Sequence, residues 1–555
     1  MILKELCKKE KKKICLNIVF IILFSFLKLL KSPLYGYTIK KISIDRKEIG
    51  IIILLNIIYF FSFSIIRIFQ SYFEEKTKAK FFYRTQKTIY SNFFKMKTSN
   101  FLETYDTSKV ITLIINESKL LVENYFMSFF ELFYLIVSFI IGFIYLFSIH
   151  FYFVLFISIA SSLAFIVSRA FAKKVENSQE RLNLSIKKLL DRVSEDFHNY
   201  INIKLFLKEV EFEDIFAKEN YKNYEARLYN GLQKKKIVNI NDVVGIFIMI
   251  GCNIIGVYLI YISKINVGDI VAVNMAIPFI VNPIFLYTKI VNLMSSSKSV
   301  LEEVEKLMNS VEIDQNFYKI DCINKIEFAN VSYGYKDNIL NKNINITFKK
   351  GNKYLILGES GVGKSSFVKL LLKLKEDYDG EVKINGKNIK NIDEKNIYSK
   401  ISVLFQKNFI IKNSFKNNIL FFGIENSEKF ENIINKLNIQ NLYENKKNLS
   451  RIIPENLSGG EIQRINLARC LYKETNVLIL DEAFSSLDTK NSDMIEKFLL
   501  NSNLLIINIS HRINYKNLKK YDKIIIFTEK DIKTYSYNEY LELIGNENLL
   551  NKDQK

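Results

Sequence analysis

Long apolar stretches fill the first half of the chain, whereas the second half alternates short apolar runs with amphipathic segments. Helices need about 20 predominantly apolar residues to cross a bilayer, and six stretches reach or approach that length. They cover residues 14–30, 49–69, 126–149, 151–172, 237–262 and 269–294. This pattern predicts a membrane domain that is all-α and has six spans.

The connections between these stretches predict a topology. Only residues 148–151 separate the third and fourth stretches, so we expect a tight turn at His150. The long connections, 70–125 and 173–236, are rich in lysine and arginine, whereas the short ones hold a single lysine. The positive-inside rule therefore places the long connections and both termini in the cytoplasm, although the outer connection 31–48 is also basic. Apolar residues at three- and four-residue steps predict that the long connections are helical.

The second half has a different periodicity. From residue 321, short strand-like runs alternate with helical stretches, which is typical of an α/β domain with a largely parallel sheet. The runs are 325–328, 354–357, 401–405, 477–480, 504–509 and 523–527. We therefore expect a membrane domain over 1–310 and an α/β domain over 321–555.

Charge and cysteine content narrow the function classes. The net charge of +21 could indicate binding to nucleic acid, to an anionic membrane surface or to a nucleotide. The densest lysine runs, 8–13 and 234–236, lie just before apolar segments, which favours cytoplasmic flanks of spans over binding of nucleic acid. Five scattered cysteines and three distant histidines suggest neither a disulfide framework nor a metal cluster.

A glycine-rich loop follows the run 354–357 and opens a helical stretch. The sequence GESGVGKS (358–365) in this context is a phosphate-binding loop, whose backbone N–H groups and helix N-terminus attract phosphate oxygens. Lys364 is expected to reach the β- and γ-phosphates of ATP, and Ser365 to bind Mg²⁺. The predicted ATP-binding residues of the loop are Gly358, Ser360, Gly361, Gly363, Lys364, Ser365 and Ser366.

Two carboxylates follow a second apolar run, 477–480. Asp481 emerges at the end of this strand, where it can reach the metal ion, and Glu482 can polarise the attacking water. Many strands end in acidic residues, so this pair alone would not indicate catalysis. It does so here because it lies downstream of the phosphate loop in the same domain.

The sequence LSGGEIQR (457–464) lies between these two elements and resembles the signature motif of ATP-binding cassette proteins. The resemblance implies ATP and Mg²⁺ as cofactors, with Ser365, Gln406 and Asp481 as metal ligands. It also implies catalytic roles for Glu482, His511 and Gln406. By the same resemblance Tyr335 stacks on adenine, and Asp488 belongs to a loop that crosses between two cassettes.

The resemblance also implies a second chain. Ser458, Gly459 and Gly460 begin a helix that would face ATP held by the opposite cassette, so the partner is a second half-transporter, identical or different. The membrane half resembles that of six-helix exporters, with coupling helices expected near 101–106 and 202–206. The stretch 450–456 departs from the acidic, glycine-bearing segment of such exporters, and the region before the signature predicts a compact helical subdomain.

These features predict ATP-driven export by alternating access, with a peptide, a lipid or a drug-like amphiphile as substrate. One alternative is a membrane ATPase whose cassettes gate a channel or have a regulatory role instead of pumping. A second alternative is a soluble cassette ATPase, which conflicts with the six predicted spans. The expected setting is the inner membrane of a prokaryote, with the lipid bilayer and an unidentified substrate as partners and no nucleic acid. Polar residues within spans usually face a cavity or a partner, and here they are Glu131, Asn253, Asn274, Asn282 and Lys289. For Glu131 and Lys289, which lie near the cytoplasmic ends of their spans, a structural role is favoured over contact with the substrate.

Overall fold

The computed structural model describes residues 8, 10–44, 49–309, 317–335, 338–440, 457–528 and 531–550. The chain forms two compact units, one of Met1–Phe94 with Thr107–Asn309 and one of Lys95–Asp106 with Ser310–Lys555. The short segment Lys95–Asp106 therefore belongs by its contacts to the second unit. The expected boundary between 310 and 321 stays a prediction, since 310–316 lie outside the described residues.

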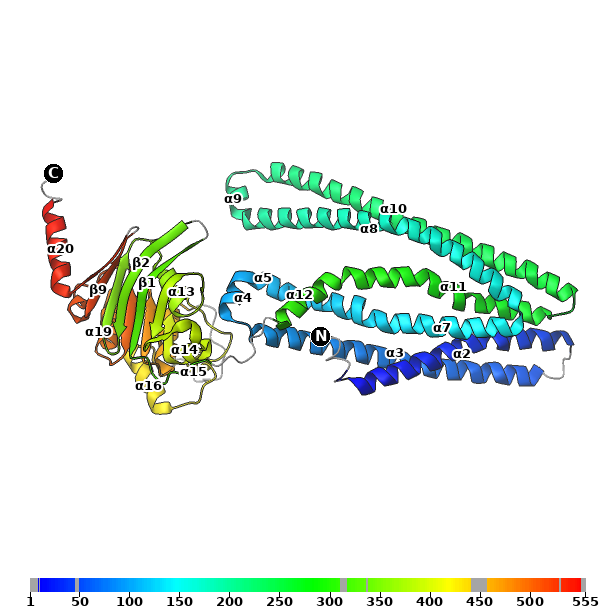
Figure 1. Cartoon of the computed structure of the whole chain (residues 1–555), viewed down its shortest axis with the longest axis horizontal. Coiled ribbons are helices and arrows are strands. Elements are labelled where there is room, and N and C mark those ends of the chain that lie inside the picture. The colour runs from blue at the N-terminus through cyan, green and yellow to red at the C-terminus, as the bar shows by residue number, and fades with distance from the viewer. Residues whose placement is uncertain are drawn as a thin grey trace. The chain divides into compact units, whose positions relative to one another are not determined.

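The first unit consists of long helices (Figure 1). They are α2 (Lys11–Ile44), α3 (Ile49–Phe93), α7 (Met127–Ile149), α8 (Phe151–His198), α10 (Glu209–Tyr261), α11 (Val267–Ser296) and α12 (Lys298–Asn309). Shorter pieces precede α7: α5 (Thr107–Thr112), α6 (Ser118–Leu120) and π-helical turns at Leu113–Glu117 and Leu121–Phe126. The helix α9 (Tyr200–Leu205) joins α8 to α10.

Five helical segments among the described residues are long and apolar enough to cross a membrane. They are Lys11–Lys41, Ile49–Phe93, Thr107–Ile149, Glu209–Tyr261 and Val267–Asn309. The remaining predicted span, 151–172, lies in α8, where Phe151–Leu163 form a shorter apolar segment and parts of 164–172 lie outside the described side chains. The predicted turn at His150 is confirmed, because α7 ends at Ile149 and α8 begins at Phe151.

Small residues let the membrane helices approach closely. A Cβ on Gly268 of α11 would lie 2.2 Å from the carbonyl oxygen of Gly36 on α2, and one on Gly142 would lie 2.6 Å from Cβ of Phe279. Such contacts are typical of helices packed in a membrane. Between α10 and α11, Asn274 Nδ2 donates to Asn253 Oδ1 at 2.7 Å, so two of the polar residues singled out from the sequence bind each other.

The second unit contains a six-stranded sheet in the order β10-β9-β3-β8-β7-β6. Five strands are parallel: β3 (Lys353–Gly358), β6 (Ile401–Leu404), β7 (Val477–Asp481), β8 (Leu505–Ile509) and β9 (Lys523–Phe527). The edge strand β10 (Ile532–Tyr535) is antiparallel. Every residue of β7 and β8 is buried, as expected for strands covered on both faces. The predicted α/β domain with a largely parallel sheet is confirmed.

One expectation about the strands was wrong. The run 325–328 does not join the parallel sheet but begins β1 (Lys325–Tyr335) of a separate antiparallel sheet. Its other strands are β2 (Asn338–Lys349), β4 (Asp379–Ile384) and β5 (Lys387–Asn388). The strands β2 and β4 intersperse polar residues with apolar ones, as half-exposed antiparallel strands do, so the sequence held no continuous apolar run that would indicate partners for β1.

The helices of the second unit complete the architecture. They are α4 (Thr98–Thr104), α13 (Lys364–Leu371), α14 (Glu394–Lys400), α15 (Phe415–Leu420), α16 (Ser427–Lys436), α18 (Gly459–Tyr472), α19 (Thr489–Leu500) and α20 (Tyr537–Leu550). Phe367 of α13 stacks on Phe328 of β1 at 4.3 Å between ring centroids, which ties the antiparallel sheet to the phosphate-loop helix. The helices α15 and α16 pack on α18 as the predicted helical subdomain. The divergent stretch 450–456 lies outside the described residues.

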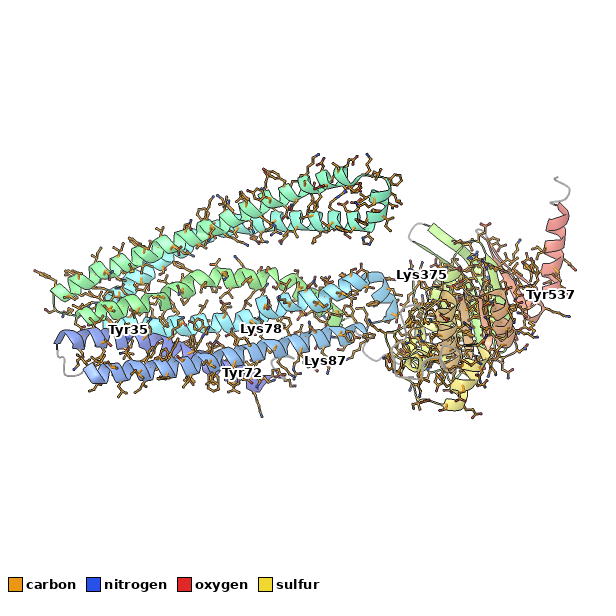
Figure 2. All side chains as sticks on the ribbon, turned by 180° about the vertical axis from the view of Figure 1, so that it is seen from behind. Tyr35, Tyr72, Lys78, Lys87, Lys375 and Tyr537 are labelled. Atoms are coloured by element: carbon orange, nitrogen blue, oxygen red, sulfur yellow. The ribbon has the colours of Figure 1, made fainter. Side chains whose placement is uncertain are left out.

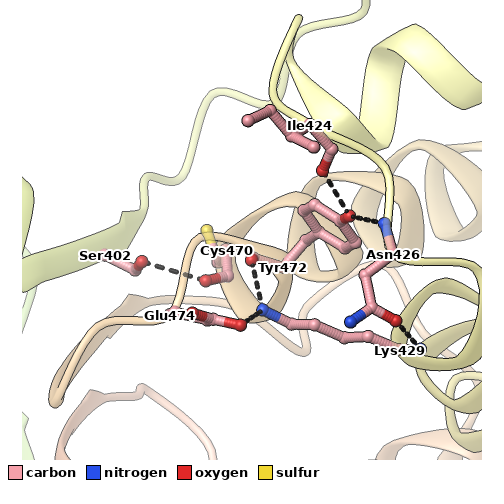
Figure 3. A network of polar contacts seen from close by, with 7 residues as sticks. All are labelled: Ser402, Ile424, Asn426, Lys429, Cys470, Tyr472 and Glu474. Atoms are coloured by element: carbon pink, nitrogen blue, oxygen red, sulfur yellow. Dashed lines mark hydrogen bonds and ion pairs between the residues drawn. The ribbon is translucent and has the colours of Figure 1, made fainter.

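The C-terminal end of α18 is anchored by a polar network (Figure 3). The hydroxyl of Tyr472 accepts from the backbone N–H of Asn426 and donates to the carbonyl of Ile424, both at 2.8 Å. Lys429 Nζ donates to the carbonyl of Tyr472 at 2.7 Å and pairs with Glu474 at 2.6 Å. These contacts fix the far end of the helix whose beginning carries the signature motif.

Candidate active site

The phosphate-binding loop connects β3 to α13, as the sequence predicts. Gly358, Gly361 and Gly363 have φ angles of 153°, 91° and 97°, which side chains rarely allow. At Gly358 a Cβ would also lie 2.5 Å from the carbonyl oxygen of Phe527. The loop therefore needs glycine at these positions for its shape. Ser360 is exposed in the loop, and Ser366 is buried in the first turn of α13.

The side chain of Lys364 lies inside the loop. It is buried, and its Nζ donates to the carbonyls of Gly358 at 2.8 Å and Glu359 at 2.6 Å. Burial lowers the pKa of this ammonium group, while Glu482 and Asp481 nearby act in the opposite direction. The cation is thus held by backbone carbonyls at the place where phosphate oxygens are expected to bind.

Tyr333 braces the same loop from the antiparallel sheet. Its buried hydroxyl donates to the carbonyl of Gly363 at 3.0 Å. No local pattern indicates this contact, because the two residues are 30 positions apart in the sequence. For Tyr335, which the resemblance pairs with adenine, the side chain lies outside the described part of the structure, so its role stays a prediction.

Asp481 ends β7 next to the phosphate loop. It is buried, and burial raises the pKa of its carboxyl group, with the neighbouring Glu482 adding to the effect. A hydrogen bond with Ser365 and the nearby Lys364 and His511 act in the opposite direction. The structure therefore brings together Ser365 and Asp481, the hydroxyl and the carboxylate predicted as metal ligands.

Glu482 is held by two further predicted residues. Gln406, just after β6, donates from Nε2 to one carboxylate oxygen at 2.9 Å, and Nε2 of His511, just after β8, lies 3.1 Å from the other. The backbone of Glu482 has φ of 54°, an unusual value for a residue with a side chain, and its N–H donates to Ile509 at 3.0 Å. Residues that end three neighbouring strands thus meet at one carboxylate.

The signature motif begins α18 with a reciprocal cap. Ser458 Oγ accepts from the N–H of Glu461 at 3.3 Å, and Glu461 accepts from the N–H of Ser458 at 2.8 Å. Near this end, a Cβ on Gly460 would lie 3.0 Å from the carbonyl oxygen of Ser486, while Gly459 has more room. Among the described residues, no hydrogen bond joins Ser458 to the phosphate loop of its own chain.

Gln463 links α18 to the residue that follows β7, and it was not predicted as a site residue. It is buried, donates to the carbonyl of Glu482 at 3.2 Å and accepts from the N–H of Ser486 at 3.2 Å. Asp488 closes this loop by capping α19, where it accepts from the N–H of Asn491 at 3.1 Å. The hydrogen bond from the Asn491 side chain lowers the pKa of Asp488.

Comparisons with known proteins match both halves of the chain. The family described as ABC transporter matches residues 341–485, and the one described as ABC transporter transmembrane region matches 14–284. A solved structure of a bacterial Atm1-family ABC exporter with ATP bound has a TM-score of 0.81 at 18% identity, covering 96% of this chain and 97% of that one. At that identity, the likeness shows the fold.

Several curated relatives are similar in sequence. An ATP-dependent lipid A-core flippase of Wigglesworthia glossinidia brevipalpis is 28% identical over 80% of this chain and 76% of its own length. The ATP-dependent permease MDL1 of Candida albicans is 29% identical over 52% of this chain. The chain spans only 44% of that permease, and 33% of a sublancin-168-processing and transport protein of Bacillus subtilis.

Proposed function

Because the chain belongs to the ATP-binding cassette transporter family, as an exporter-type half-transporter, we propose that it uses ATP hydrolysis to export a substrate across a membrane. The observation that carries this proposal is the convergence of Gln406, Glu482 and His511 at the ends of three strands, beside the phosphate loop. A carboxylate held in this way can orient a water molecule for attack on the γ-phosphate.

Mg²⁺ is proposed as the companion of ATP. The hydrogen-bonded pair of Ser365 and Asp481 offers two oxygen ligands of the kind this ion takes. No cluster of three or more His, Cys, Asp or Glu side chains that could hold a metal occurs in the described part of the chain, which fits an ion held partly by phosphates. Mg²⁺ neutralises charge on phosphate oxygens when bound. Gln406 is the third proposed ligand.

The chain would work as one of a pair. Ser458 and the glycines after it begin a 14-residue helix, and no hydrogen bond within the described residues turns Ser458 toward its own phosphate loop. The partial positive charge at the start of that helix is therefore free to act on ATP bound by a second chain. Lys364 and Glu482 of one chain and Ser458 of the other would complete each site.

Short helices support the coupling of hydrolysis to transport. Near the two positions expected to carry coupling helices, the structure has α4 and α9. At the start of α4, both the N–H and the hydroxyl of Thr98 donate to the carboxylate of Glu394 on α14, at 3.2 and 3.3 Å. We propose that α4 carries movements of the ATPase unit to the helices that flank it in the chain, in an alternating-access cycle.

The proposed setting is a cell membrane with both termini in the cytoplasm. The long connections that carry α4 and α9 hold most of the loop lysines and arginines, as cytoplasmic connections do. A prokaryotic inner membrane is the proposed location.

Inside-out vesicles test the proposal. Vesicles that contain the wild-type chain or the Glu482→Gln variant are incubated with a cell extract and ATP, and their contents are compared by mass spectrometry. We expect wild-type vesicles to accumulate at least one lipid, peptide or small amphiphile that the variant, which retains bound ATP, does not. Equal contents in wild-type, variant and empty vesicles would contradict a pump.

The alternative function is a gated channel. It would appear as an ATP-dependent ion conductance of the same vesicles that persists in Glu482→Gln, because gating needs binding of ATP rather than its hydrolysis. A conductance of that kind without accumulation would replace export with gating.

A further inference from the structure

Lys28 lies deep within an apolar helix, where a charge needs an explanation. On α2 it is eight positions from Gly36, which contacts the first turn of α11, and fifteen from Lys13. A helix rises about 1.5 Å per residue, so these points lie about 12 and about 22 Å from Lys28 along the helix. In Figure 2, Tyr35 of α2 is near one end of the helices, and Lys78 and Lys87 of α3 are toward the other. The apolar helix extends over Lys11–Lys41, beyond the predicted span 14–30, so Lys28 lies near its middle.

Side chains from three helices surround the ammonium group of Lys28. It donates to the hydroxyl of Tyr134 on α7 at 2.8 Å. It also lies 5.5 Å from the centre of the Tyr134 ring and 5.9 Å from the centres of Phe24 and Phe279. The cation therefore points toward the rings of α2, α7 and α11, although Lys28 remains exposed.

A second cation touches the same ring. The guanidinium carbon of Arg67 on α3 lies 5.0 Å from the centre of Phe24, and Arg67 donates to Gln70 at 2.5 Å. In the part of the chain that the structure describes, neither Lys28 nor Arg67 forms an ion pair with a carboxylate. Gln70 in turn donates to the carboxylate of Glu74 at 2.7 Å, so Arg67 reaches a carboxylate only through Gln70. Among the described residues, the two cations thus share one aromatic ring without a direct counter-ion.

Two charges among membrane helices carry a cost that packing alone does not require. A lysine or arginine at mid-membrane costs about 2.5–3.5 kcal/mol on insertion scales. A cation over an aromatic ring recovers about 0.5–2 kcal/mol, and a hydrogen bond to a charged group about 1.5–3 kcal/mol. The rings, Tyr134 and Gln70 therefore offset much of this cost but leave both charges unneutralised. Apolar side chains at both positions would give the helix pair the same packing without the cost. The missing partner for these charges is an anion.

We propose that Lys28 and Arg67 form a binding site for an amphiphile with an acidic headgroup. The headgroup, a phosphate, sulfate or carboxylate, would bind both cations. The apolar part would lie along neighbouring rings, such as Phe63, whose centre is 5.6 Å from that of Phe24. This inference rests on the proposed function and names the class of its substrate. The same charges would repel cationic amphiphiles.

Binding to the full-length protein in nanodiscs of phosphatidylcholine, without ATP, tests the site. Radiolabelled decyl phosphate, decyltrimethylammonium and decyl maltoside share one tail and differ in headgroup charge. We expect saturable binding of decyl phosphate alone, above that of empty nanodiscs. Lys28→Gln and Arg67→Gln should each weaken it about tenfold, which corresponds to about 1.4 kcal/mol, and Lys28→Arg should retain it. Inorganic phosphate should not compete at equal concentration.

Lys31→Gln is the matched control, because Lys31 lies over the ring of Tyr35 on the same helix, at 5.4 Å, and shares that ring with no second cation among the described residues. It should bind decyl phosphate as the wild type does. If phosphatidylglycerol in the nanodisc competes with decyl phosphate, the site is assigned to an anionic lipid. If it does not compete, the site is assigned to a soluble amphiphile. Equal binding of all three headgroups, or unchanged binding in Lys28→Gln, would overturn the proposal. If Lys28→Gln does not fold, Arg67→Gln and the headgroup comparison decide.

The test separates this inference from the proposed function. Binding is measured without ATP, so a protein that binds decyl phosphate but fails the vesicle experiment would keep the site and lose the pump. A protein that passes the vesicle experiment but binds the three decyl compounds alike would keep the pump and lose the site.

Discussion

Single residues set the conformation of Glu482, the proposed activator of water. Its two carboxylate oxygens face Gln406 and His511 at 2.9 and 3.1 Å, and its backbone adopts a left-handed conformation. A residue held in that conformation costs of order 1–3 kcal/mol, which the surroundings must supply. The strain and the two partners together fix the direction in which the carboxylate points.

His511→Ala should therefore lower kcat for ATP hydrolysis by about 100-fold or more, a usual size for the loss of a group that positions a proton transfer. KM for ATP should change little, since the phosphate loop is untouched. Steady-state hydrolysis by the purified full-length protein measures both constants. His198→Ala, at an exposed histidine of α8, is the control and should behave as wild type. An unchanged kcat in His511→Ala would remove this residue from the site.

Asp481 links the site to stability. Burial raises the pKa of this carboxyl group above 3.8, so its ionised form costs stability in the folded state. The cost is absent below pH 3.8, grows as the pH rises from 3.8 through the raised pKa and is complete above it. Asp481→Asn should accordingly raise the apparent Tm at pH 7.5, and the gain should shrink as the pH falls, while hydrolysis is lost.

A thermal melt of the full-length protein at several pH values checks this prediction. Asp377→Asn, at an exposed carboxylate of the same unit, should leave the Tm unchanged. A Tm of Asp481→Asn that is lower than wild type at pH 7.5 would mean that the contacts of the carboxylate outweigh the cost of burying its charge.

The site residues that could be identified from the sequence are those that belong to local motifs. Lys364, Asp481 and Glu482 follow strands in fixed order, and the structure gathers them as expected. Tyr333 and Gln463 bind through contacts that no local pattern encodes. Lys28 sits in an apolar stretch that was identified only as a span, because a membrane helix tolerates one lysine without losing its apolar character.

Among the helices and strands, α18 is held at both ends. The cap of Ser458 and Glu461 fixes its beginning, and the network around Tyr472 fixes its end (Figure 3). Gln463, one turn into the helix, connects it to the carbonyl of Glu482. These contacts connect the first turn of α18 to Glu482 at the end of β7.

Tyr472→Phe removes two hydrogen bonds from the end of α18. Each contributes about 0.5–1.5 kcal/mol, so the loss should lower stability by about 1–3 kcal/mol. We expect a fall in Tm of several degrees with ATP hydrolysis retained below it. Tyr515→Phe, at an exposed tyrosine of the same unit, should melt as the wild type does. If the two variants melted alike, the network would not stabilise the helix.

At α4, Glu394 accepts two hydrogen bonds from Thr98 at the helix start. Glu394→Ala leaves these donors without their acceptor, which should loosen α4 by about 1–2 kcal/mol and speed trypsin cleavage within Lys95–Asp106 by about tenfold. Mass spectrometry of timed digests measures the rate. Glu431→Ala on the exposed face of α16 is the control. Equal cleavage in both variants would show that Glu394 does not hold α4.

Elements with strong periodicity were predicted well, and weakly patterned ones were not. The parallel strands β3, β7 and β8 are continuous apolar runs, and the structure places them side by side. The antiparallel sheet was missed because β2 and β4 intersperse polar and charged residues with apolar ones. The short helix α4 was placed in sequence, but its membership of the second unit depends on contacts such as that with Glu394.

At the scale of the whole molecule, one chain supplies half of each proposed catalytic site. Lys364 and Glu482 belong to the phosphate-loop side, and Ser458 to the side that would complete the site of a partner chain. This arrangement explains why a single cassette fused to a membrane domain is expected to be inactive alone. It also makes the partnership testable without knowledge of the substrate.

Mixed pairs of inactive chains give the most direct test of the composite site. Chains with Glu482→Gln and chains with Ser458→Arg, carrying different affinity tags, are co-expressed and purified through both tags, and ATP hydrolysis is measured. Each variant alone should be inactive. The mixed pair should regain hydrolysis, because one of its two sites combines an intact Glu482 with an intact Ser458 from the other chain. Mixed pairs as inactive as either parent would contradict a site shared between two copies of this chain.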